Sequence, residues 1–310
     1  MNCVSVCCAP FIIVNVMLGK MVRHMFGHYG FSGSEQNMND MSQAEKIMPR
    51  YTLDVSWASD VGRVRGENED NFACDLGVGL LVLADGMGGC QAGEVASAIA
   101  VSTVMQELAQ KPQSGAYRSQ YDAGALSPVV TRMCNAVNLA NQAVFEAAML
   151  EPQLAGMGST LVIAQFHDDK VTVANIGDSR LYLQREGVFR QLTVDHTVLQ
   201  EQIEYGLPPL NEFQRIAAGS MLTRALGIES QIMLDVFEQN VCPGDIFLLC
   251  SDGLYDMLSD DEMGMILLNS AEKKLDQVAQ DLVSRANEKG GMDNITLILV
   301  KAGHSRLTVL

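Results

Sequence analysis

Four short apolar segments of this chain have an aspartate within two residues of one end. The pairings are residues 80–84 with Asp85, residues 171–176 with Asp178, Ile246–Cys250 with Asp252, and residues 295–300 with Asp293. Short segments rich in Val, Ile and Leu are typical of buried strands. The pattern therefore places several carboxylates at one edge of a sheet, where they repel one another unless cations neutralise them.

Ligand sets made only of oxygen favour Mg²⁺, Mn²⁺ or Ca²⁺. A single Asp-Gly pair is equally typical of a turn, but turns alone do not explain why the pattern recurs at four strand ends. The spacing is not that of an EF-hand loop, and residues 85–89 lack the pattern of a P-loop. Residues 156–160 lead into a strand rather than a helix, which favours close packing there over phosphate binding.

Hydrophobic periodicity and turn residues predict one continuous domain over residues 49–302, followed by a tail at 303–310. Helices are predicted at 93–110, 128–150, 259–268 and 275–289. Strands are predicted at 53–59, 72–75, 79–84, 160–166, 170–176, 180–185, 245–250 and 294–300. Because the strands come in hairpin-like groups between helix pairs, the fold class is α+β with largely antiparallel sheets. Residues 195–220 interrupt the strand grouping and are predicted to form an inserted flap.

Composition narrows the class of protein further. The chain of 310 residues has a formal net charge of −16 and is 48% hydrophobic. Nucleic-acid and anionic-membrane binders need clustered Lys and Arg, so neither partner is expected. Eight cysteines without a CxxC pair do not have zinc-ligand spacing, and they favour a reducing, cytoplasmic location.

Residues 1–48 are interpreted as an extension and linker. Residues 3–18 are almost free of charge and precede Lys20 and Arg23, whereas a secretory signal carries its positive charge first. Three alternatives stay open. The segment is disordered or lies upstream of the true start, it is a weak membrane anchor acylated at Cys7 or Cys8, or it packs on the domain. The first is preferred, and only the second adds membrane association.

An ordered set of motifs in this chain resembles that of the metal-dependent protein phosphatases, the type 2C family, and specifically of their bacterial branch. The motifs are GENED at 66–70, ADGMGG at 84–89, GST at 158–160, NIGDSR at 175–180, DH at 195–196, TRALG at 223–227, SDGL at 251–254 and GMDNIT at 291–296. Each motif is weak alone, but their order over about residues 50–302 is specific. The resemblance implies two central, mostly antiparallel β-sheets sandwiched between helix pairs.

The resemblance also implies a centre of two Mn²⁺ or Mg²⁺ ions. Asp85 is expected to bridge both ions, the Gly86 carbonyl to bind one, and Asp252 and Asp293 to bind the other. Glu69 and Asp70 match an acidic pair that holds metal-bound water. Asp178 and Asp256, with Asp252, match a third, weaker site. Arg65 matches the family's phosphate-binding arginine, and it acts with Asp85 in catalysis.

The implied reaction is hydrolysis of phosphoserine and phosphothreonine in proteins by a metal-activated water. Met87 stands where eukaryotic members carry a histidine thought to protonate the leaving alcohol, so the general acid is unassigned. The expected partners are phosphorylated proteins and an opposing serine/threonine kinase, and the expected state is a monomer. The alternative is a pseudophosphatase, which would bind phosphoproteins without turnover.

Overall fold

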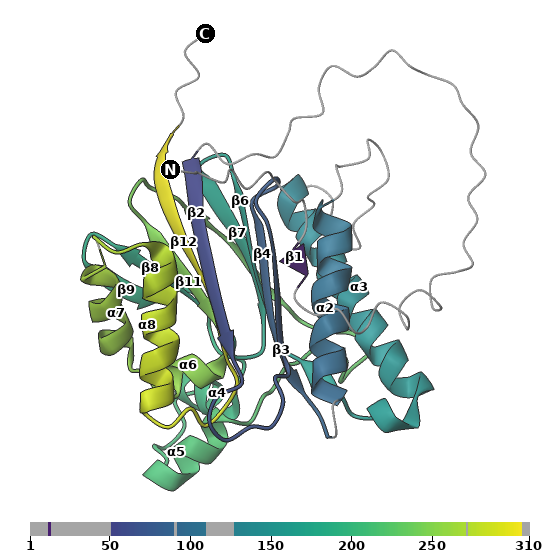
Figure 1. The fold of residues 1–310 in the computed structure, drawn as a ribbon. Helices are drawn as coiled ribbons and strands as arrows, with labels where there is room; N and C mark the ends of the chain where they lie inside the picture. The colour runs from purple at the N-terminus through teal and green to yellow at the C-terminus, as the bar shows by residue number, and fades with distance from the viewer. Residues whose placement is uncertain (1–11, 14–50, 90–91, 110–126, 271, 306–310) are drawn as a thin grey trace, which may run out of the picture.

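The structure is a computed structural model that describes residues 12–13, 51–89, 92–109, 127–270 and 272–305 (Figure 1). Its strands form two sheets whose pairings are all antiparallel. The first sheet has the order β1-β3-β4-β6-β7-β10, with β5 paired to β4, and the second has the order β2-β12-β11-β8-β9.

The strands have the following bounds. The first sheet contains β1 (Ile12–Ile13), β3 (Asp70–Asp75), β4 (Leu80–Met87), β5 (Gly158–Ser159), β6 (Leu161–His167), β7 (Lys170–Ile176) and β10 (Asp235–Asn240). The second contains β2 (Tyr51–Asp60), β8 (Arg180–Arg185), β9 (Val188–Gln191), β11 (Ile246–Cys250) and β12 (Ile295–Ser305).

A helix pair covers the outer face of each sheet. Helices α2 (Ala92–Ala109) and α3 (Pro128–Leu150) pack on the first sheet, and α7 (Asp260–Leu268) and α8 (Leu275–Glu288) pack on the second (Figure 1). Three short helices, α4 (Val198–Glu204), α5 (Glu212–Gly219) and α6 (Asp252–Tyr255), gather at one end, and a 3₁₀ turn, η2 (Pro152–Leu154), follows α3. The predicted fold class, two antiparallel sheets between helix pairs, is confirmed.

Local sequence signals explain where the longer helices begin. The Ser127 hydroxyl accepts a hydrogen bond from the Val130 N–H at 3.3 Å, and Pro128 occupies the first helical position of α3. At α7, Ser259 and Glu262 form a reciprocal capping box. Both helix starts were predicted, and both are confirmed.

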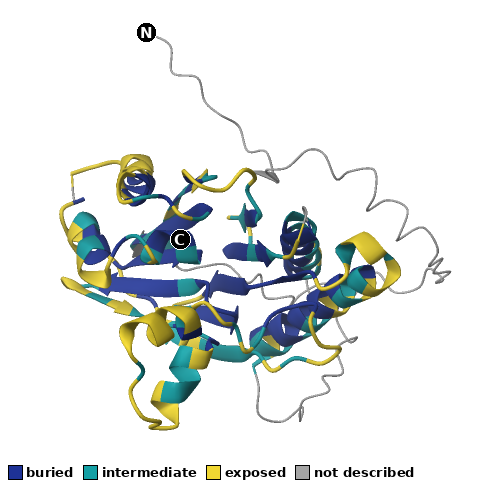
Figure 2. Cartoon of the chain, turned by 90° about the horizontal axis from the view of Figure 1, so that it is seen from below, coloured by how far each residue is buried: buried dark blue, intermediate teal, exposed yellow. Residues whose placement is uncertain are grey.

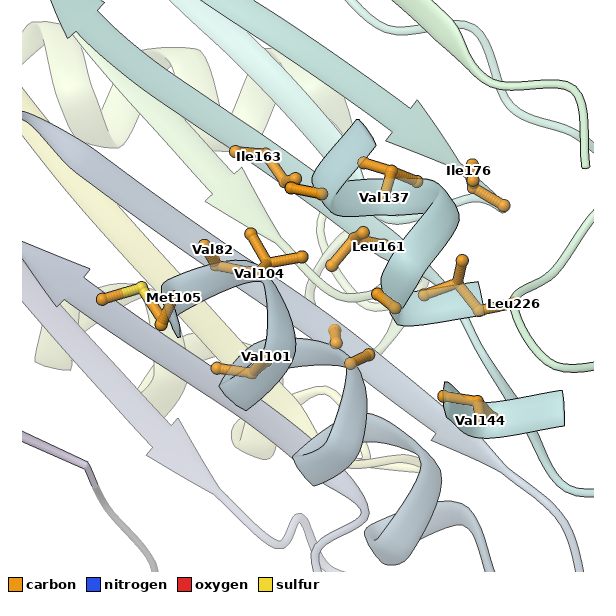
Figure 3. Close-up of a cluster of buried hydrophobic side chains, with 14 of the residues drawn as sticks. Val82, Val101, Val104, Met105, Val137, Val144, Leu161, Ile163, Ile176 and Leu226 are labelled. Atoms are coloured by element: carbon orange, nitrogen blue, oxygen red, sulfur yellow. The ribbon is translucent and has the colours of Figure 1, made fainter. Parts of the chain in front are cut away.

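The core has three apolar layers because each strand alternates its side chains between the two faces of its sheet. One layer lies between the first sheet and α2 and α3 (Figure 3), a second between the sheets, and a third between the second sheet and α7 and α8. Phe166 and Phe247 meet edge-to-face across the sheets, with ring centroids 5.2 Å apart. Figure 2 shows the buried strands in the middle and exposed residues on the outer helices and loops.

Several elements differ from the sequence prediction. Strands β9 and β10 were not predicted, because VFRQ and DVFEQN are half-exposed edge strands without a continuous apolar run. Strand β12 continues to Ser305, past the predicted end at residue 300 and into the expected tail, because it pairs with β2 as far as Tyr51. The predicted flap region contains α4 and α5.

The interpretation of residues 1–48 falls almost entirely outside the described residues. The exception is β1, which pairs with β3 through Ile12 and Cys74 and through Ile13 and Ala73. Among the described helices, none is both long and apolar enough to cross a membrane.

Candidate metal centre

A pocket of about 680 Å³ opens at the end of the sandwich where α4, α5 and α6 gather (Figure 1). Eight of the nine residues singled out from the sequence line it: Arg65, Glu69, Asp85, Gly86, Asp178, Asp252, Asp256 and Asp293. The ninth, Asp70, stands directly opposite Asp85 in the register of β3 and β4. Residues up to 228 positions apart in sequence therefore meet at one place.

The end of β4 places Asp85 in this pocket. Its backbone N–H donates to the Thr160 hydroxyl at 2.9 Å, and its carbonyl accepts from the Ser159 hydroxyl at 2.9 Å. Within residues 156–160, the predicted close packing is found at Gly158, where a Cβ would lie 2.9 Å from the Leu226 carbonyl oxygen, but not at Gly156, which has open space around it. The strand end is thereby fixed by its neighbours rather than by its own side chain.

Gly86 is required because the strand meets the start of α2 here. A Cβ on Gly86 would collide with the backbone carbonyl of Gly93 and lie 2.8 Å from the Glu69 carbonyl. The Gly86 N–H donates to that Glu69 carbonyl at 3.2 Å. Only glycine allows three backbone segments to approach so closely beside the acids.

Asp252 opens the short helix α6, directly after β11. The next residue, Gly253, packs against the backbone of Asn294, where a Cβ would collide with the carbonyl oxygen. Asp256 closes the same helix, with its N–H donating to the Asp252 carbonyl at 2.8 Å. One helical turn therefore presents two acids to the pocket from the same side.

Burial and mutual repulsion dominate the electrostatics of the site. Burial, followed by repulsion from the neighbouring aspartates, raises the pKa of Asp85 and of Asp252 well above the ordinary value. Burial raises the pKa of Asp70 to about 6, against hydrogen bonding from the Ser251 hydroxyl at 2.8 Å. Burial and then repulsion from Asp195 raise the pKa of Asp178 to about 6. These carboxyls are held where their charged form is disfavoured, so a bound cation would stabilise them.

The donor set fits a divalent metal ion. Asp70 Oδ1 and Asp252 Oδ1 are buried and have no hydrogen-bond partner among the described residues, which leaves two buried acceptor atoms available as ligands. The side chains do not, however, already stand as a finished ligand shell. In the described part of the chain, no group of three or more His, Cys, Asp or Glu side chains is arranged to hold an ion as it stands.

Two observations account for that disagreement between the pocket and the side-chain arrangement. Arg65 Nη2 donates to Asp293 Oδ2 at 2.7 Å, so one expected ligand is engaged with the expected phosphate-binding residue. The expected set also includes the Gly86 carbonyl, a backbone oxygen. The burial, the raised pKa values and the oxygen-only lining nevertheless fit a divalent cation.

Nucleophilic catalysis by cysteine finds no support here. Cys134 and Cys250 are buried in the core and Cys74 is partly buried, and burial raises the pKa of all three thiols. None of the four cysteines that the structure describes lines the pocket. Met87 does line it and carries no proton to donate, which leaves the general acid unassigned as expected from the sequence.

His196 belongs to the structural support of the flap. It is 3% exposed, its Nδ1 accepts from the Gly177 N–H at 3.1 Å, and its Nε2 lies 3.3 Å from Asp235. Burial and then the charge of Arg224 lower its pKa, against the hydrogen bond with Asp235. The contact with Gly177 fixes the turn that carries Asp178 to the first residues of the flap.

Sequence reasoning gave no role to Asn294, although it stands inside a quoted motif. Its Nδ2 donates to the carbonyls of Val61 and Glu67 at 3.0 and 2.9 Å, and its Oδ1 accepts from the Glu69 N–H at 2.8 Å. A single side chain therefore ties the loop that carries Arg65 and Glu69 to the start of β12. Arg224 and Thr223 also line the pocket from the segment after the flap.

Comparison with known proteins defines the class that this fold and acidic pocket belong to. The family model described as Protein phosphatase 2C matches residues 64–299. The chain belongs to the protein phosphatase 2C family.

Individual relatives agree with that assignment. The serine/threonine phosphatase stp of Listeria monocytogenes is 34% identical over 252 residues, which is 80% of this chain and 96% of that protein. The structure of PstP/Ppp from Mycobacterium tuberculosis is 32% identical with a TM-score of 0.70, covering 81% of this chain and 99% of that one. A structure of the PstP catalytic domain in complex with two manganese ions has a TM-score of 0.68 at 30% identity, covering 81% and 99%.

Proposed function

We propose that this chain is a metal-dependent protein phosphatase that hydrolyses phosphoserine and phosphothreonine in proteins. The observation that carries the proposal is the convergence of aspartates from β4, α6 and the segment before β12 on one pocket, with Asp70 of β3 directly opposite Asp85. Among the described residues, Asp70 Oδ1 and Asp252 Oδ1 are buried without a hydrogen-bond donor. Membership of the protein phosphatase 2C family and the likeness to bacterial serine/threonine phosphatases support it.

Asp85, the Gly86 carbonyl, Asp252 and Asp293 are the residues that would hold two ions, with Asp70 and Glu69 contributing through bound water. Asp178 and Asp256, with Asp252, would hold a third. The complex of PstP with two manganese ions supports Mn²⁺ as a fitting metal, and Mg²⁺ accepts the same oxygen ligands. When bound, such ions lower the pKa of water for in-line attack on phosphorus and offset the charge of the phosphoryl oxygens.

Arg65 would bind the phosphoryl group. Its side chain is 51% exposed at the rim of the pocket, so its guanidinium can reach an incoming phosphate. A planar guanidinium donates two parallel hydrogen bonds to phosphate oxygens. When a phosphate replaces Asp293 as its partner, Asp293 becomes free to serve as a metal ligand. Substrate binding and completion of the ligand set would then favour each other.

The proposed substrates are phosphorylated proteins, with an opposing serine/threonine kinase as the natural counterpart in signalling. The segment after α5, residues 220–228, forms part of the pocket wall and so stands where a protein substrate would contact the chain. We place the enzyme in the cytoplasm as a monomer. Free, buried thiols at Cys134 and Cys250 support a reducing compartment.

The test is phosphate release from a phosphothreonine peptide by the purified chain, with Mn²⁺, with EDTA, and as Asp252→Asn. The matched control is Asp261→Asn, which makes the same chemical change at an exposed acid of α7. We expect release that requires Mn²⁺, disappears in Asp252→Asn and persists in Asp261→Asn. If the folded, metal-loaded wild type releases no more phosphate than Asp252→Asn, the chain is a phosphoprotein-binding pseudophosphatase instead.

A further inference from the structure

A second recess, of about 250 Å³, lies away from the acidic pocket, between the second sheet and the start of α8. The two cavities share no lining residue. In the register of β12 with β2, the acidic end lies at Ile295 opposite Asp60, and the recess lies at Lys301 opposite Asp54. Six strand residues span about 20 Å, so a ligand in the recess would not touch the catalytic residues.

The lining of this recess is unusual for a chain with a net charge of −16. The structure describes five lysines, and three of them, Lys273, Lys274 and Lys301, line the recess. Lys170, Lys273 and Lys289 each form an ion pair with a carboxylate. Lys274 and Lys301 form none with any described carboxylate, although acidic residues outnumber basic ones 37 to 21. The two described lysines without an acidic partner therefore face the same cavity.

Backbone groups add to the positive character. Lys274 is the residue that precedes the first turn of α8, a helix of 14 residues. The N–H groups of Leu275 and Asp276 in that turn have no partner inside the helix and carry the positive end of its dipole. Helix N-termini of this kind bind phosphate through backbone N–H groups.

Two acids line the recess as well and limit the ligands it can take. Asp276 Oδ1 accepts from the Ser56 hydroxyl at 2.6 Å, which directs that oxygen to β2. Asp54 stands at the exposed edge strand of the sheet. Two unpaired ammonium groups with a helix N-terminus match the charge of a compact dianion, whereas a monoanionic carboxylate would leave one ammonium group unbalanced.

We propose that this recess is a second anion site that binds a phosphoryl group through Lys274, Lys301 and the first-turn N–H groups of α8. The group has two possible sources, free inorganic phosphate or a phosphorylated side chain of a protein. The geometry does not involve the catalytic pocket, so the site stands whether or not the chain hydrolyses phosphoproteins.

The test uses the full chain as Asp252→Asn, kept free of metal by EDTA so that the acidic pocket repels anions. Amide NMR spectra are recorded during titration with inorganic phosphate and, separately, with a phosphothreonine peptide and its unphosphorylated form. We expect saturable shifts at Leu275, Asp276 and Lys301. In Lys274→Gln/Lys301→Gln the affinity should fall at least tenfold, while Lys289→Gln, at a lysine paired elsewhere, should bind as before.

The two probes separate the sources. Tighter binding of the phosphopeptide than of inorganic phosphate assigns the site to phosphorylated proteins, and equal binding assigns it to free phosphate. Absence of saturable shifts at these residues with both probes overturns the proposal, and so does equal affinity in the double lysine variant. Far-UV circular dichroism checks that each lysine variant is folded when it also carries Asp252→Asn. With Asp252 restored and Mn²⁺ added, the double lysine variant should keep its basal activity, because neither lysine lies in the catalytic pocket.

Discussion

Strands β4, β11 and β12 pass through the apolar layer between the sheets, and each has one end beside the acidic pocket. Between the sheets, Leu83, Leu249 and Ile298 are fully buried among apolar neighbours. Only two to five residues from these positions, Asp85, Asp252 and Asp293 line the acidic pocket. The middle of the sandwich stabilises the fold, whereas its end contains charges that oppose folding until something neutralises them.

This contrast separates stability from function along a single strand. Burying apolar surface between the sheets lowers the free energy of the folded state. Gathering desolvated carboxylates raises it. Changes in the two regions should therefore act on the stability of the metal-free protein in opposite directions.

Asp252→Asn should lower phosphate release by about 1000-fold or more, beyond the ~10–100-fold typical of residues that only support a metal's ligands. The same change should raise the free energy of unfolding of the metal-free protein, because it removes a buried charge that its neighbours repel. Phosphate release and urea unfolding measure the two effects. A metal-free variant less stable than the metal-free wild type would contradict the claim that the acidic end opposes folding.

Phe247→Ala should lower the free energy of unfolding and leave the activity per folded molecule nearly unchanged. Phe247 is fully buried and meets Phe166 across the sheets, so its truncation should cost about 3–5 kcal/mol of stability. Phe237→Ala, at a partly buried position of the edge strand β10, should cost less. Urea unfolding gives both values. Activity per folded molecule of Phe247→Ala should stay near that of the wild type, and a large loss would show that the regions are coupled.

Asn294→Ala should lower activity by roughly 10–100-fold through misplacement of the loop that carries Arg65 and Glu69. The side chain touches three backbone groups of residues 61–69 but none of the expected ligands' carboxylates. Asn138→Ala, which removes a comparable amide on α3, is the matched control. Equal activity in the two variants would contradict a positioning role.

The pH dependence of stability should also report the acidic end. Asp70 and Asp178 have folded pKa values of about 6, above the value of about 3.9 for an unfolded aspartate. The folded state therefore binds more protons between these values, and stability falls as pH rises. From pH 5 to pH 7.5 the metal-free protein should lose about 1 kcal/mol for each carboxyl. Saturating Mn²⁺ should remove this loss in thermal unfolding scans, and a metal-free protein more stable at pH 7.5 would refute it.

Met87→Leu should change activity the least. The thioether has no proton to give, and leucine conserves its volume, so we expect phosphate release within about threefold of the wild type. Steady-state kinetics with the phosphothreonine peptide provide the measurement. A tenfold loss would show that the sulfur atom takes part in the reaction.

The sequence predicted the helices and buried strands of the apolar region well. Helix α3 follows from Ser127 and Pro128, and the strands β4, β7, β8 and β11 follow from short runs of Val, Leu and Ile between turn residues. Strand β10 could not be predicted, because DVFEQN becomes a strand only through its pairing with β7. Such edge strands depend on tertiary contacts more than on their own composition.

At the acidic end, the sequence identified the residues but not their contacts. The recurrence of aspartate at strand ends, with the family motifs, selected the residues that line the pocket. Nothing in the sequence indicates that Arg65 pairs with Asp293, because that contact joins residues 228 positions apart. Asn294 was passed over because an asparagine next to a predicted ligand has no distinctive pattern of its own. The roles of all these residues as ligands remain predictions.

The most direct test of the contrast is calorimetric titration of Mn²⁺ into the metal-free protein at pH 6, repeated in buffers of different ionisation enthalpy. The account predicts that two ions bind and that protons are released, because the cations displace protons from carboxyls whose pKa is raised. In Asp252→Asn fewer ions and fewer protons should be counted. Failure to bind Mn²⁺, or binding without proton release, would contradict the claim that these acids are buried together to hold cations.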